Sequence, residues 1–305
     1  MRRDIQTKIL AWYKEHKRDL PWRKTRDPYK ILVSEVMLQQ TQVSRVVDKY
    51  KQFLKLFPTV QALAKTKTSD VLKAWAGLGY NRRALYLQKT AQAVVTLYKG
   101  KFPKDLELLK ELPGIGDYTA RAILSFAFGE SVPVLDTNHR KFYQRTYFGK
   151  RVVDDKVLLK KAESVIARSF KATKQSKERH KIASLPATVV RNDRVYDWNQ
   201  ALMDFMTAVS QKSNDPFIIW YQKNYPAYKS KKTSKHENKL IIRFEDSDRY
   251  FRGRIIDLLR TEHQTSISIL QRRFNQISKE RVKKIVAGLL KDGLILIQNK
   301  SILLP

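Results

Sequence analysis

Cysteine is absent from this chain of 305 residues. That absence excludes disulfide bonds, thiol catalysis and the thiolate ligands that hold zinc ions or iron–sulfur clusters. The five histidines do not recur at a spacing that metal ligands use. The sequence therefore predicts neither a metal ion nor another cofactor.

Long hydrophobic runs are absent as well. No apolar stretch approaches the roughly 20 residues that a membrane-spanning helix needs. The segment from Met1 to Trp22 is basic and amphipathic, but it has neither the apolar core nor the cleavage site of a signal peptide. We therefore expect a cytoplasmic protein with no membrane partner.

Acidic residues are scarce. The chain has 29 Asp and Glu against 61 Lys and Arg, which gives a net charge of +32. Such an excess predicts an anionic partner, and nucleic acid is the leading candidate because its binding neutralises many phosphates and releases their counterions. An anionic membrane surface is the lesser candidate.

What the chain does contain, up to about residue 220, is one amphipathic helical pattern after another. Apolar residues recur at three- and four-residue spacing, and Pro and Gly separate the segments. A basic insert at 171–194 and a lysine-rich stretch at 221–239 lack this periodicity. We predict a helical domain over 1–228, a linker over 229–242 and a second domain over 243–305.

The second domain has a different pattern. Three short helical stretches precede LILIQ and SILLP, which alternate around Asn299-Lys300 as the strands of a hairpin do. Three helices and a hairpin are the winged-helix order. Ser278 is a suitable N-cap for the third helix. That helix would bury four apolar residues and leave three basic ones outside, namely Val282, Ile285, Val286 and Leu289 against Arg281, Lys283 and Lys284. A winged helix usually binds DNA through that helix, and a packing module is the alternative.

LPGIGDYTARAILSF, from Leu112 to Phe126, predicts a hairpin between two helices. The glycines at 114 and 116 permit close backbone approach, and the N-terminus of the second helix favours an anion. Gly114 and Gly116 are therefore candidates for gripping a DNA phosphate without reading sequence. An ordinary helix–helix turn is the alternative.

Glu35 stands in ILVSEVML, an otherwise apolar segment. On a continuous helix Glu35, Gln39 and Gln42 would form a line at the edge of the apolar face. The amides could then hydrogen-bond a flipped base, and a partly desolvated Glu35 would have a raised pKa and act as a proton donor. A solvated residue at the helix boundary is the alternative.

Asp136, in VPVLDTNHRKF, supplies a second carboxylate. Its position predicts a helix N-cap, and a cap can also face a cleft. Two carboxylates of unlike environment suit cleavage of a glycosidic bond, since one protonates the leaving group and the other stabilises or attacks the sugar. In a DNA-binding protein the N-glycosidic bond of a flipped nucleotide fits this scheme.

Seven motifs together resemble the adenine DNA glycosylases (MutY family) of the helix-hairpin-helix glycosylase superfamily, over roughly residues 8–210. The motifs are LPWR, DPYKILVSEVMLQQTQV, WAGLGYNRRALYL, FP, LPGIGDYTARAIL, VLDTN and WNQALMDF. The resemblance implies a mainly α, two-lobed fold with the active site between the lobes. It also implies a monomer that acts on mismatched or damaged double-stranded DNA in the prokaryotic nucleoid.

The resemblance implies a role for each matching residue. Glu35 would protonate the adenine ring, Asp136 would stabilise the cationic sugar, and Tyr118 and Asn138 would support them. Tyr118 stands where strand-cutting relatives have lysine, which implies a monofunctional enzyme. Tyr80 would be the wedge in the duplex. The remaining residues that we assign to DNA or to the bases are Arg23, Leu38, Gln39, Gln40, Thr41 and Gln200.

Two departures accompany the resemblance. The family's iron–sulfur ligands would fall on Ser210, Phe217, Trp220 and Pro226, which include no ligand, and we predict that Phe217 and Trp220 replace the cluster with apolar packing. A winged-helix pattern stands where the family has a Nudix-like reader of oxidised guanine. We predict removal of adenine opposite guanine or 8-oxoguanine. A thymine or uracil mismatch glycosylase and a non-catalytic DNA-binding protein are the alternatives.

Overall fold

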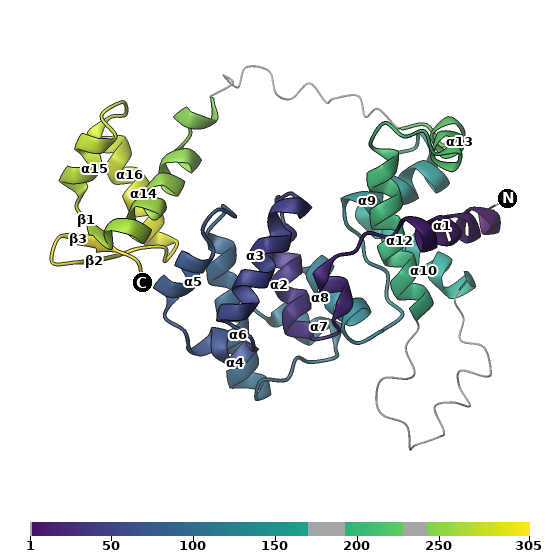
Figure 1. Cartoon of the computed structure of the whole chain (residues 1–305), viewed down its shortest axis with the longest axis horizontal. Coiled ribbons are helices and arrows are strands. Elements are labelled where there is room, and N and C mark those ends of the chain that lie inside the picture. The colour runs from purple at the N-terminus through teal and green to yellow at the C-terminus, as the bar shows by residue number, and fades with distance from the viewer. Residues whose placement is uncertain (1, 170–192, 228–242) are drawn as a thin grey trace. The chain divides into compact units, whose positions relative to one another are not determined.

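The computed structural model describes residues 2–169, 193–227 and 243–305, which belong to two compact units (Figure 1). The first unit comprises 1–31, 104–107 and 116–235, and the second comprises 32–103, 108–115 and 236–305. The predicted linker at 229–242 lies outside the described residues. So does the predicted insert, except for its last two residues, Asp193 and Arg194, which begin a helix.

Helices build the first unit. Its elements are α1 (Arg2–His16), the 3-10 turn η1 (Pro21–Lys24), α8 (Asp117–Phe126), α9 (Thr137–Tyr143), the π-helical turn η2 (Gln144–Phe148), α10 (Asp155–Ser169), α12 (Asp193–Val209) and α13 (Pro216–Asn224). Two further helices, α2 (Pro28–Leu38) and α7 (Leu106–Glu111), begin in this unit and continue into the second along the chain.

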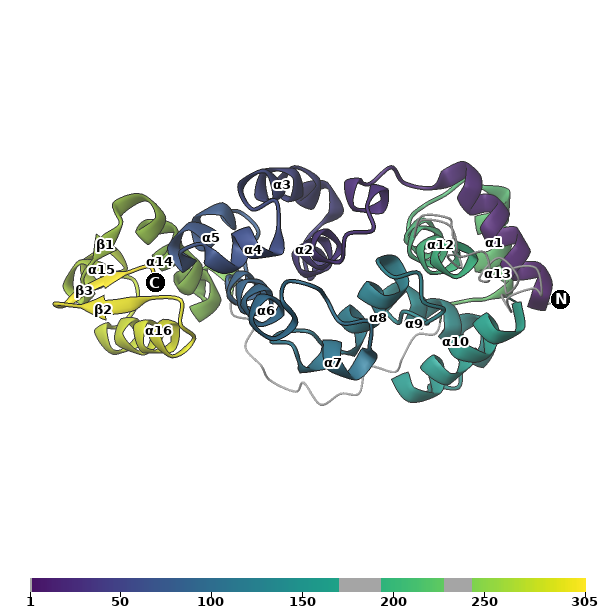
Figure 2. The same ribbon diagram turned by 90° about the horizontal axis from the view of Figure 1, so that it is seen from below.

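Helix α12 is the centre of the first unit, where it packs against α1, α8, α9 and α13. Figure 2 shows it beside α1 and α13. Its apolar residues recur at helical spacing and are buried, as Trp198, Leu202 and Phe205 illustrate. Each such side chain contributes roughly 1.5–3 kcal/mol through burial. This core fixes the N-terminus of α9, which carries Asp136 and Asn138.

The second unit contains a second helical core. Besides most of α2 and α7 it has α3 (Val43–Leu56), α4 (Val60–Lys65), α5 (Thr68–Ala74) and α6 (Arg82–Tyr98). Helix α6 packs against α4 and α5, and its residues Leu85, Leu87 and Val94 are buried. The start of α6 carries the loop that contains Tyr80.

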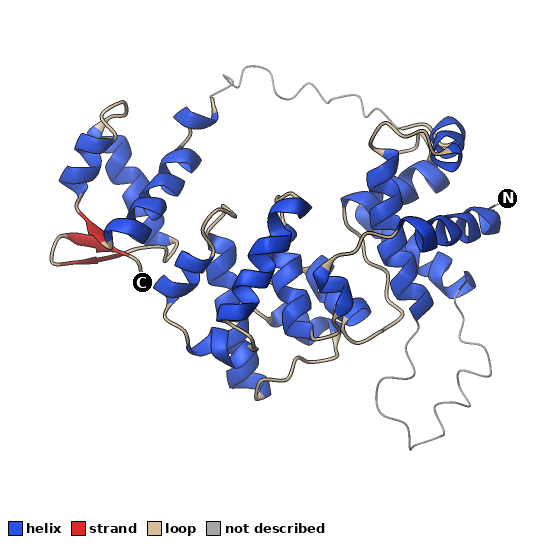
Figure 3. Ribbon diagram, in the orientation of Figure 1, coloured by secondary structure: helices blue, strands red, loops and turns tan. Residues whose placement is uncertain are grey.

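The C-terminal part of the second unit combines helices with a small sheet. It contains η3 (Phe244–Asp246), α14 (Asp248–Glu262), β1 (Gln264–Thr265), α15 (Ile267–Arg273), α16 (Lys279–Lys291), β2 (Leu296–Gln298) and β3 (Ser301–Leu303). The strand order is β1-β3-β2, all antiparallel, and within the described ranges these are the only strands (Figure 3). We call residues 243–305 the C-terminal module.

Two predictions for the C-terminal module are confirmed. Ser278 caps α16 by accepting a hydrogen bond from the backbone amide of Arg281, and α16 buries the four predicted apolar residues. The predicted hairpin pairs Gln298 with Ser301, and its turn residues Asn299 and Lys300 have φ of 48° and 64°. Positive φ at both central residues matches a type I′ turn, whose twist suits a two-residue hairpin.

The predicted mainly α fold class is confirmed. Helix α13 and the turn η2 were not predicted, because their apolar spacing is irregular, and α9 was predicted only through its N-cap Asp136. One predicted helical segment, from Tyr29 to Phe57, is instead two helices, α2 and α3. None of the helices in the described ranges is long and apolar enough to cross a membrane.

Candidate active site

Glu35 lies on α2 inside an unbroken buried run from Ile31 to Met37. Its side chain is buried, with only 6% of the residue exposed. Asp27 starts the helix by accepting a hydrogen bond from the backbone amide of Tyr29 at 2.9 Å. Glu35 is therefore a buried carboxyl group, and the alternative of a solvated boundary residue is wrong.

The predicted line of Glu35, Gln39 and Gln42 along one helix is wrong. Helix α2 ends at Leu38, which is partly buried. Gln39 and Gln40 are exposed, Gln40 has φ of 55°, and Gln42 is the N-cap of α3. A residue with positive φ cannot continue a right-handed helix. The side-chain amides of Gln39 and Gln42 therefore do not extend the face of α2 that carries Glu35.

Arg83, which was not predicted, stabilises this turn. Its guanidinium donates hydrogen bonds to the carbonyl oxygens of Val36, Met37 and Gln39 at 2.6–3.0 Å and to Thr41 Oγ1 at 3.1 Å. These carbonyls belong to the last turn of α2, where helix geometry provides no amide partners. Burial lowers the pKa of Arg83 to about 10.

Arg83 also ties the turn after α2 to the Tyr80 loop, which we define as residues 77–81. The guanidinium donates to the carbonyl oxygens of Leu78 and Gly79 at 2.9 and 3.1 Å. Tyr80 has φ of 48°, an unfavourable value for an aromatic residue, and its side chain is 41% exposed. Arginine in the sequence GLGYNRR gave no distinctive signal because so many basic residues surround it.

The hairpin between α7 and α8 forms as predicted. Gly114 has φ of +80°, and a Cβ atom there would lie 2.7 Å from Cβ of Tyr86, so both backbone and space require glycine. Gly116 is the N-cap of α8. Gly114 and Gly116 are exposed, and their amides donate to no partner within the described residues. Tyr118, at the second position of α8, is partly buried.

Asp136 is the N-cap of α9, as predicted, and it has a partner that the sequence analysis missed. Its Oδ1 accepts hydrogen bonds from the His139 backbone amide at 2.8 Å and from His139 Nδ1 at 2.6 Å. Burial alone would raise the pKa of Asp136, but the charge and hydrogen bond of His139, with the amides of His139 and Asn138, lower that pKa. Asp136 is thus an anion held in place. The D-x-x-H spacing was the available signal.

His139 itself is wholly buried, and no described atom lies within hydrogen-bond reach of its Nε2. Its neighbour Asn138 donates through Nδ2 to the Met203 carbonyl oxygen at 3.1 Å and to Thr207 Oγ1 at 3.2 Å. These bonds join the start of α9 to α12. Gln200, also on α12, is buried.

Arg23 is engaged within the protein. Its guanidinium forms two hydrogen bonds with Asp204, at 2.7 and 2.8 Å, and Arg18 Nε adds a third at 2.6 Å. The side chains of Arg23 and Asp204 are 9% and 2% exposed. Burial opposes ionisation of Asp204, but Arg23 and Arg18 hold its pKa below the ordinary value. Arg23 therefore fixes the segment between α1 and α2 to α12.

The four positions that correspond to iron–sulfur ligands do not fit such a cluster. Ser210 and Pro226 lie just beyond the ends of α12 and α13, and Phe217 and Trp220 lie on α13. None of the four carries a thiolate. Across the described ranges no group of three or more His, Asp or Glu could hold a metal ion.

Of the two residues predicted to provide apolar packing at the positions of cluster ligands, Phe217 packs on the core and Trp220 is largely at its edge. Phe217 packs on the core and stacks with Phe205 at 5.2 Å between ring centroids. Trp220 is 38% exposed. Helix α13 instead buries Ile218 and Tyr221, three residues apart, and this spacing turns Trp220 outward.

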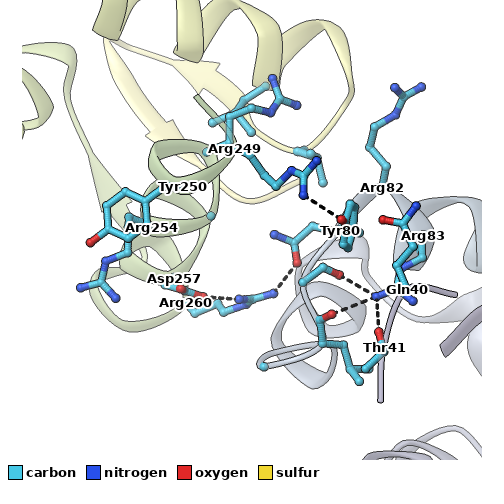
Figure 4. Close-up of a pocket in the computed structure, with 18 of the residues that line it drawn as sticks. Gln40, Thr41, Tyr80, Arg82, Arg83, Arg249, Tyr250, Arg254, Asp257 and Arg260 are labelled. Carbon is cyan, nitrogen blue, oxygen red and sulfur yellow. Dashed lines mark hydrogen bonds and ion pairs between the residues drawn. The ribbon is translucent and has the colours of Figure 1, made fainter. Parts of the chain in front are cut away.

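Several predicted DNA-binding residues of the second unit lie around one cavity (Figure 4). Gln40, Thr41 and Tyr80 line it together with arginines of α14. In the first unit, Asp136 and Asn138 share the N-terminus of α9, and Gln200 lies on α12.

Residues 33–168 match the family described as the HhH-GPD superfamily of base excision DNA repair proteins. The chain is 46% identical over 145 residues to the adenine DNA glycosylase of Mycobacterium tuberculosis. The aligned segment covers 47% of this chain and 48% of that relative. The chain is 45% identical over 139 residues to the human adenine DNA glycosylase, covering 43% and 26%. The match thus spans less than half the length of each relative.

The solved structures that are similar to the chain include the following two. A thermostable thymine-DNA glycosylase has a TM-score of 0.57 and 28% identity, covering 70% of this chain and 89% of that one. A trapped complex of endonuclease III with DNA has a TM-score of 0.51 and 18% identity, and the match covers 70% of this chain and 88% of that one. At this identity the similarity shows a shared fold only. Residues 33–168 are therefore similar to the HhH-GPD superfamily of base excision DNA repair proteins, and part of the chain is similar to adenine DNA glycosylases.

Proposed function

We propose that this chain is a monofunctional DNA glycosylase of base excision repair, which removes adenine mispaired with guanine or 8-oxoguanine by hydrolysing its N-glycosidic bond. The observation that carries the proposal is a pair of carboxylic side chains in unlike surroundings. Glu35 is buried in an apolar helix, whereas Asp136 is kept ionised by His139. Glycosidic hydrolysis uses such a pair, one as acid and one as anion.

Each carboxyl group has one role in this mechanism. Glu35 donates a proton to the adenine ring, which turns the base into a better leaving group. For this step Glu35 must carry its proton when the base arrives. As the base leaves, positive charge develops on the sugar, and the Asp136 anion stabilises that charge. Water then completes the hydrolysis.

DNA binding follows from the charge and from the hairpin. The free amides of Gly114 and Gly116 would bind a phosphate of the DNA backbone, helped by the N-terminus of α8. The target adenine must leave the base stack to reach Glu35. Tyr118 has no amine, so it cannot form the Schiff base through which a lysine cuts the strand.

A panel of labelled duplexes tests the proposal. Each duplex carries A, T or U opposite G or 8-oxoguanine, and strand cutting is measured with and without alkali. We expect cutting of the adenine duplexes only after alkali, and no covalent adduct with borohydride. Release of no base from any duplex would refute the proposal, and efficient borohydride trapping would refute the monofunctional assignment.

Thymine removal is the second candidate. The similarity to a thermostable thymine-DNA glycosylase, at 28% identity over most of that chain, favours it. The duplex with thymine opposite guanine separates the two candidates, because an adenine glycosylase leaves it intact.

The regions outside the HhH-GPD match also have proposed roles. We propose that α13 packs where relatives hold an iron–sulfur cluster and that this chain needs no metal. We further propose that 243–305 are a separate winged-helix domain, joined by a linker at 229–242 to a glycosylase domain over 1–228, and that the protein acts as a monomer.

A further inference from the structure

The C-terminal module rests on the Tyr80 loop through its first helix, α14. Arg249 donates a hydrogen bond to the Tyr80 hydroxyl at 2.8 Å, and its guanidinium lies 5.0 Å from the centroid of that ring. Arg260 donates to Asn81 Oδ1 at 2.9 Å and to the Leu72 carbonyl oxygen at 3.0 Å. Figure 4 shows the arginines of α14 and the Tyr80 loop around a common space.

That space is a cavity of about 920 Å³ within the second unit. The described residues that line it include seven arginines and one acidic residue, Asp257. Three of the arginines, Arg45, Arg249 and Arg254, form no ion pair with a described carboxylate and are exposed. Such uncompensated guanidinium groups are ligands for phosphate.

Aromatic side chains lie among these arginines. Tyr80, Tyr86 and Phe244 line the same cavity and are 41%, 39% and 57% exposed. Exposed rings beside guanidinium groups are the combination on which unpaired nucleotides stack while their phosphates are bound. The cavity has the size of pockets that hold small organic ligands, about 300–1,000 Å³.

The third helix of the module, α16, is less suited to this task than the sequence predicts. The guanidinium of Arg281 donates to Asp248 Oδ1 at 2.8 Å and to the backbone oxygen of Asp246, so it is engaged within the module. Lys283 and Lys284 remain exposed on α16. Two lysines on one helix are a weaker anion site than the arginines around the cavity.

We propose that the C-terminal module binds a DNA strand through α14, with an unstacked nucleotide in the cavity and its phosphates on Arg45, Arg249 and Arg254. In this arrangement Arg249 is also a positioning residue, which orients the Tyr80 ring for stacking. The inference deepens the proposed function, on which it rests, because it names the part of the chain that holds the opened strand.

The test compares two pairs of substitutions in the full chain. Arg249→Ala with Arg254→Ala removes two charges from α14, and Lys283→Ala with Lys284→Ala removes two from α16 as the matched control. Affinity for a fluorescein-labelled undamaged duplex is measured against salt concentration. We expect the α14 pair to lower the salt slope by about two and to weaken binding roughly ten- to hundredfold. The control should change the slope far less.

A second measurement tests whether Tyr80 and α14 unstack a base, which affinity alone does not show. A duplex with 2-aminopurine at its centre becomes more fluorescent when that base is unstacked. At saturating protein, we expect the original chain and the α16 pair to raise the fluorescence, and the α14 pair and Tyr80→Ala to fail. A wild-type salt slope in the α14 pair, or an equal loss in both pairs, would overturn the inference. The free nucleotide dAMP is a further probe. If dAMP bound the original chain as tightly as the duplex does, the cavity would be a site for a nucleotide and not for a DNA strand, and the inference would also be overturned.

Adenine excision by the same variants separates this inference from the proposed function. If the original chain excises adenine and the α14 pair binds DNA normally, only the inference fails. If the original chain excises no base while the slope falls as expected, only the proposed function fails.

Discussion

Two aspartates of the first unit have pKa values that different neighbours lower. Asp136 relies on one buried histidine, and Asp204 relies on two arginines, Arg18 and Arg23. In both, the folded protein lowers the pKa of a carboxyl group that burial alone would raise. The first arrangement serves the proposed chemistry, whereas the second holds the chain between α1 and α2 in place.

His139→Ala should slow adenine release and change its pH dependence. The substitution removes a hydrogen bond to an ion, worth about 1.5–3 kcal/mol, so the single-turnover rate should fall roughly 10- to 150-fold if the bond matters equally in the transition state. Without His139 the pKa of Asp136 rises, so the acidic limb of the rate profile should move to higher pH. His16→Ala, beside Asp215, is the control. An unchanged acidic limb would count against the role of His139.

Asp204→Asn should destabilise the fold by about 3–5 kcal/mol, because it leaves Arg23 buried without a counter-charge. Folding lowers the pKa of Asp204, so ionised Asp204 stabilises the folded protein. This stabilisation is complete at a pH above the pKa of the unfolded chain, about 3.9, and it is lost as the pH falls through the lower pKa of the folded protein. The variant should therefore lose less stability between neutral pH and acid. Asp155→Asn, in an exposed pair with Arg140, should cost at most about 1 kcal/mol. Equal effects in urea unfolding would contradict the account.

At the scale of elements, α13 and the turn after α2 stabilise the parts of the chain that carry the proposed site residues. Helix α13 is fixed by Asp215, its N-cap, which also accepts a hydrogen bond from Trp12 Nε1 at 2.9 Å. Its buried Tyr221 shares a hydrogen bond of 2.9 Å with Thr146 Oγ1 in η2. A short helix thus ties α1, α12 and η2 together.

Tyr221→Ala should cost about 3–5 kcal/mol of stability, as large-to-small changes of buried aromatic residues do. Trp220→Ala should cost less, about 1–2 kcal/mol, because that side chain is 38% exposed and its main contacts are the rings of Phe217 and Tyr225. Chemical unfolding of the two variants compares them directly. A greater loss with Trp220→Ala would mean that α13 packs in another orientation.

Sequence periodicity predicted the long helices and several short ones, and it failed at α13 and η2, whose apolar spacing is irregular. The apolar spacing in Arg82–Tyr98 and Asp193–Val209 is regular over several turns, so α6 and α12 were predictable. The break between α2 and α3 was not, because it depends on Arg83, which is distant along the chain and binds the carbonyl oxygens of α2. Trp220 was misplaced because no helix was predicted over Pro216–Asn224, so the direction of each side chain there could not be assigned.

At the scale of the whole molecule, the net charge of +32 and the run of seven motifs pointed to DNA and to the HhH-GPD superfamily. Individual residues were harder to predict. Glu35 and Asp136 were identified from motifs, whereas His139, Arg83 and Arg249 were found only through their contacts. Arg83 has no distinctive sequence spacing because its partners are mostly backbone carbonyls, and Arg249 has none because its partner Tyr80 is distant along the chain.

The central claim is that Glu35 is the acid that protonates adenine, and single-turnover release of adenine by Glu35→Gln tests it most directly. Glutamine keeps the shape of the side chain but has no acidic proton. With the exposed Glu15→Gln as control, and with DNA affinity measured in parallel, we predict a rate that falls by about 10²–10⁴-fold while binding persists. A Glu35→Gln protein that releases adenine at the unchanged rate would contradict the account.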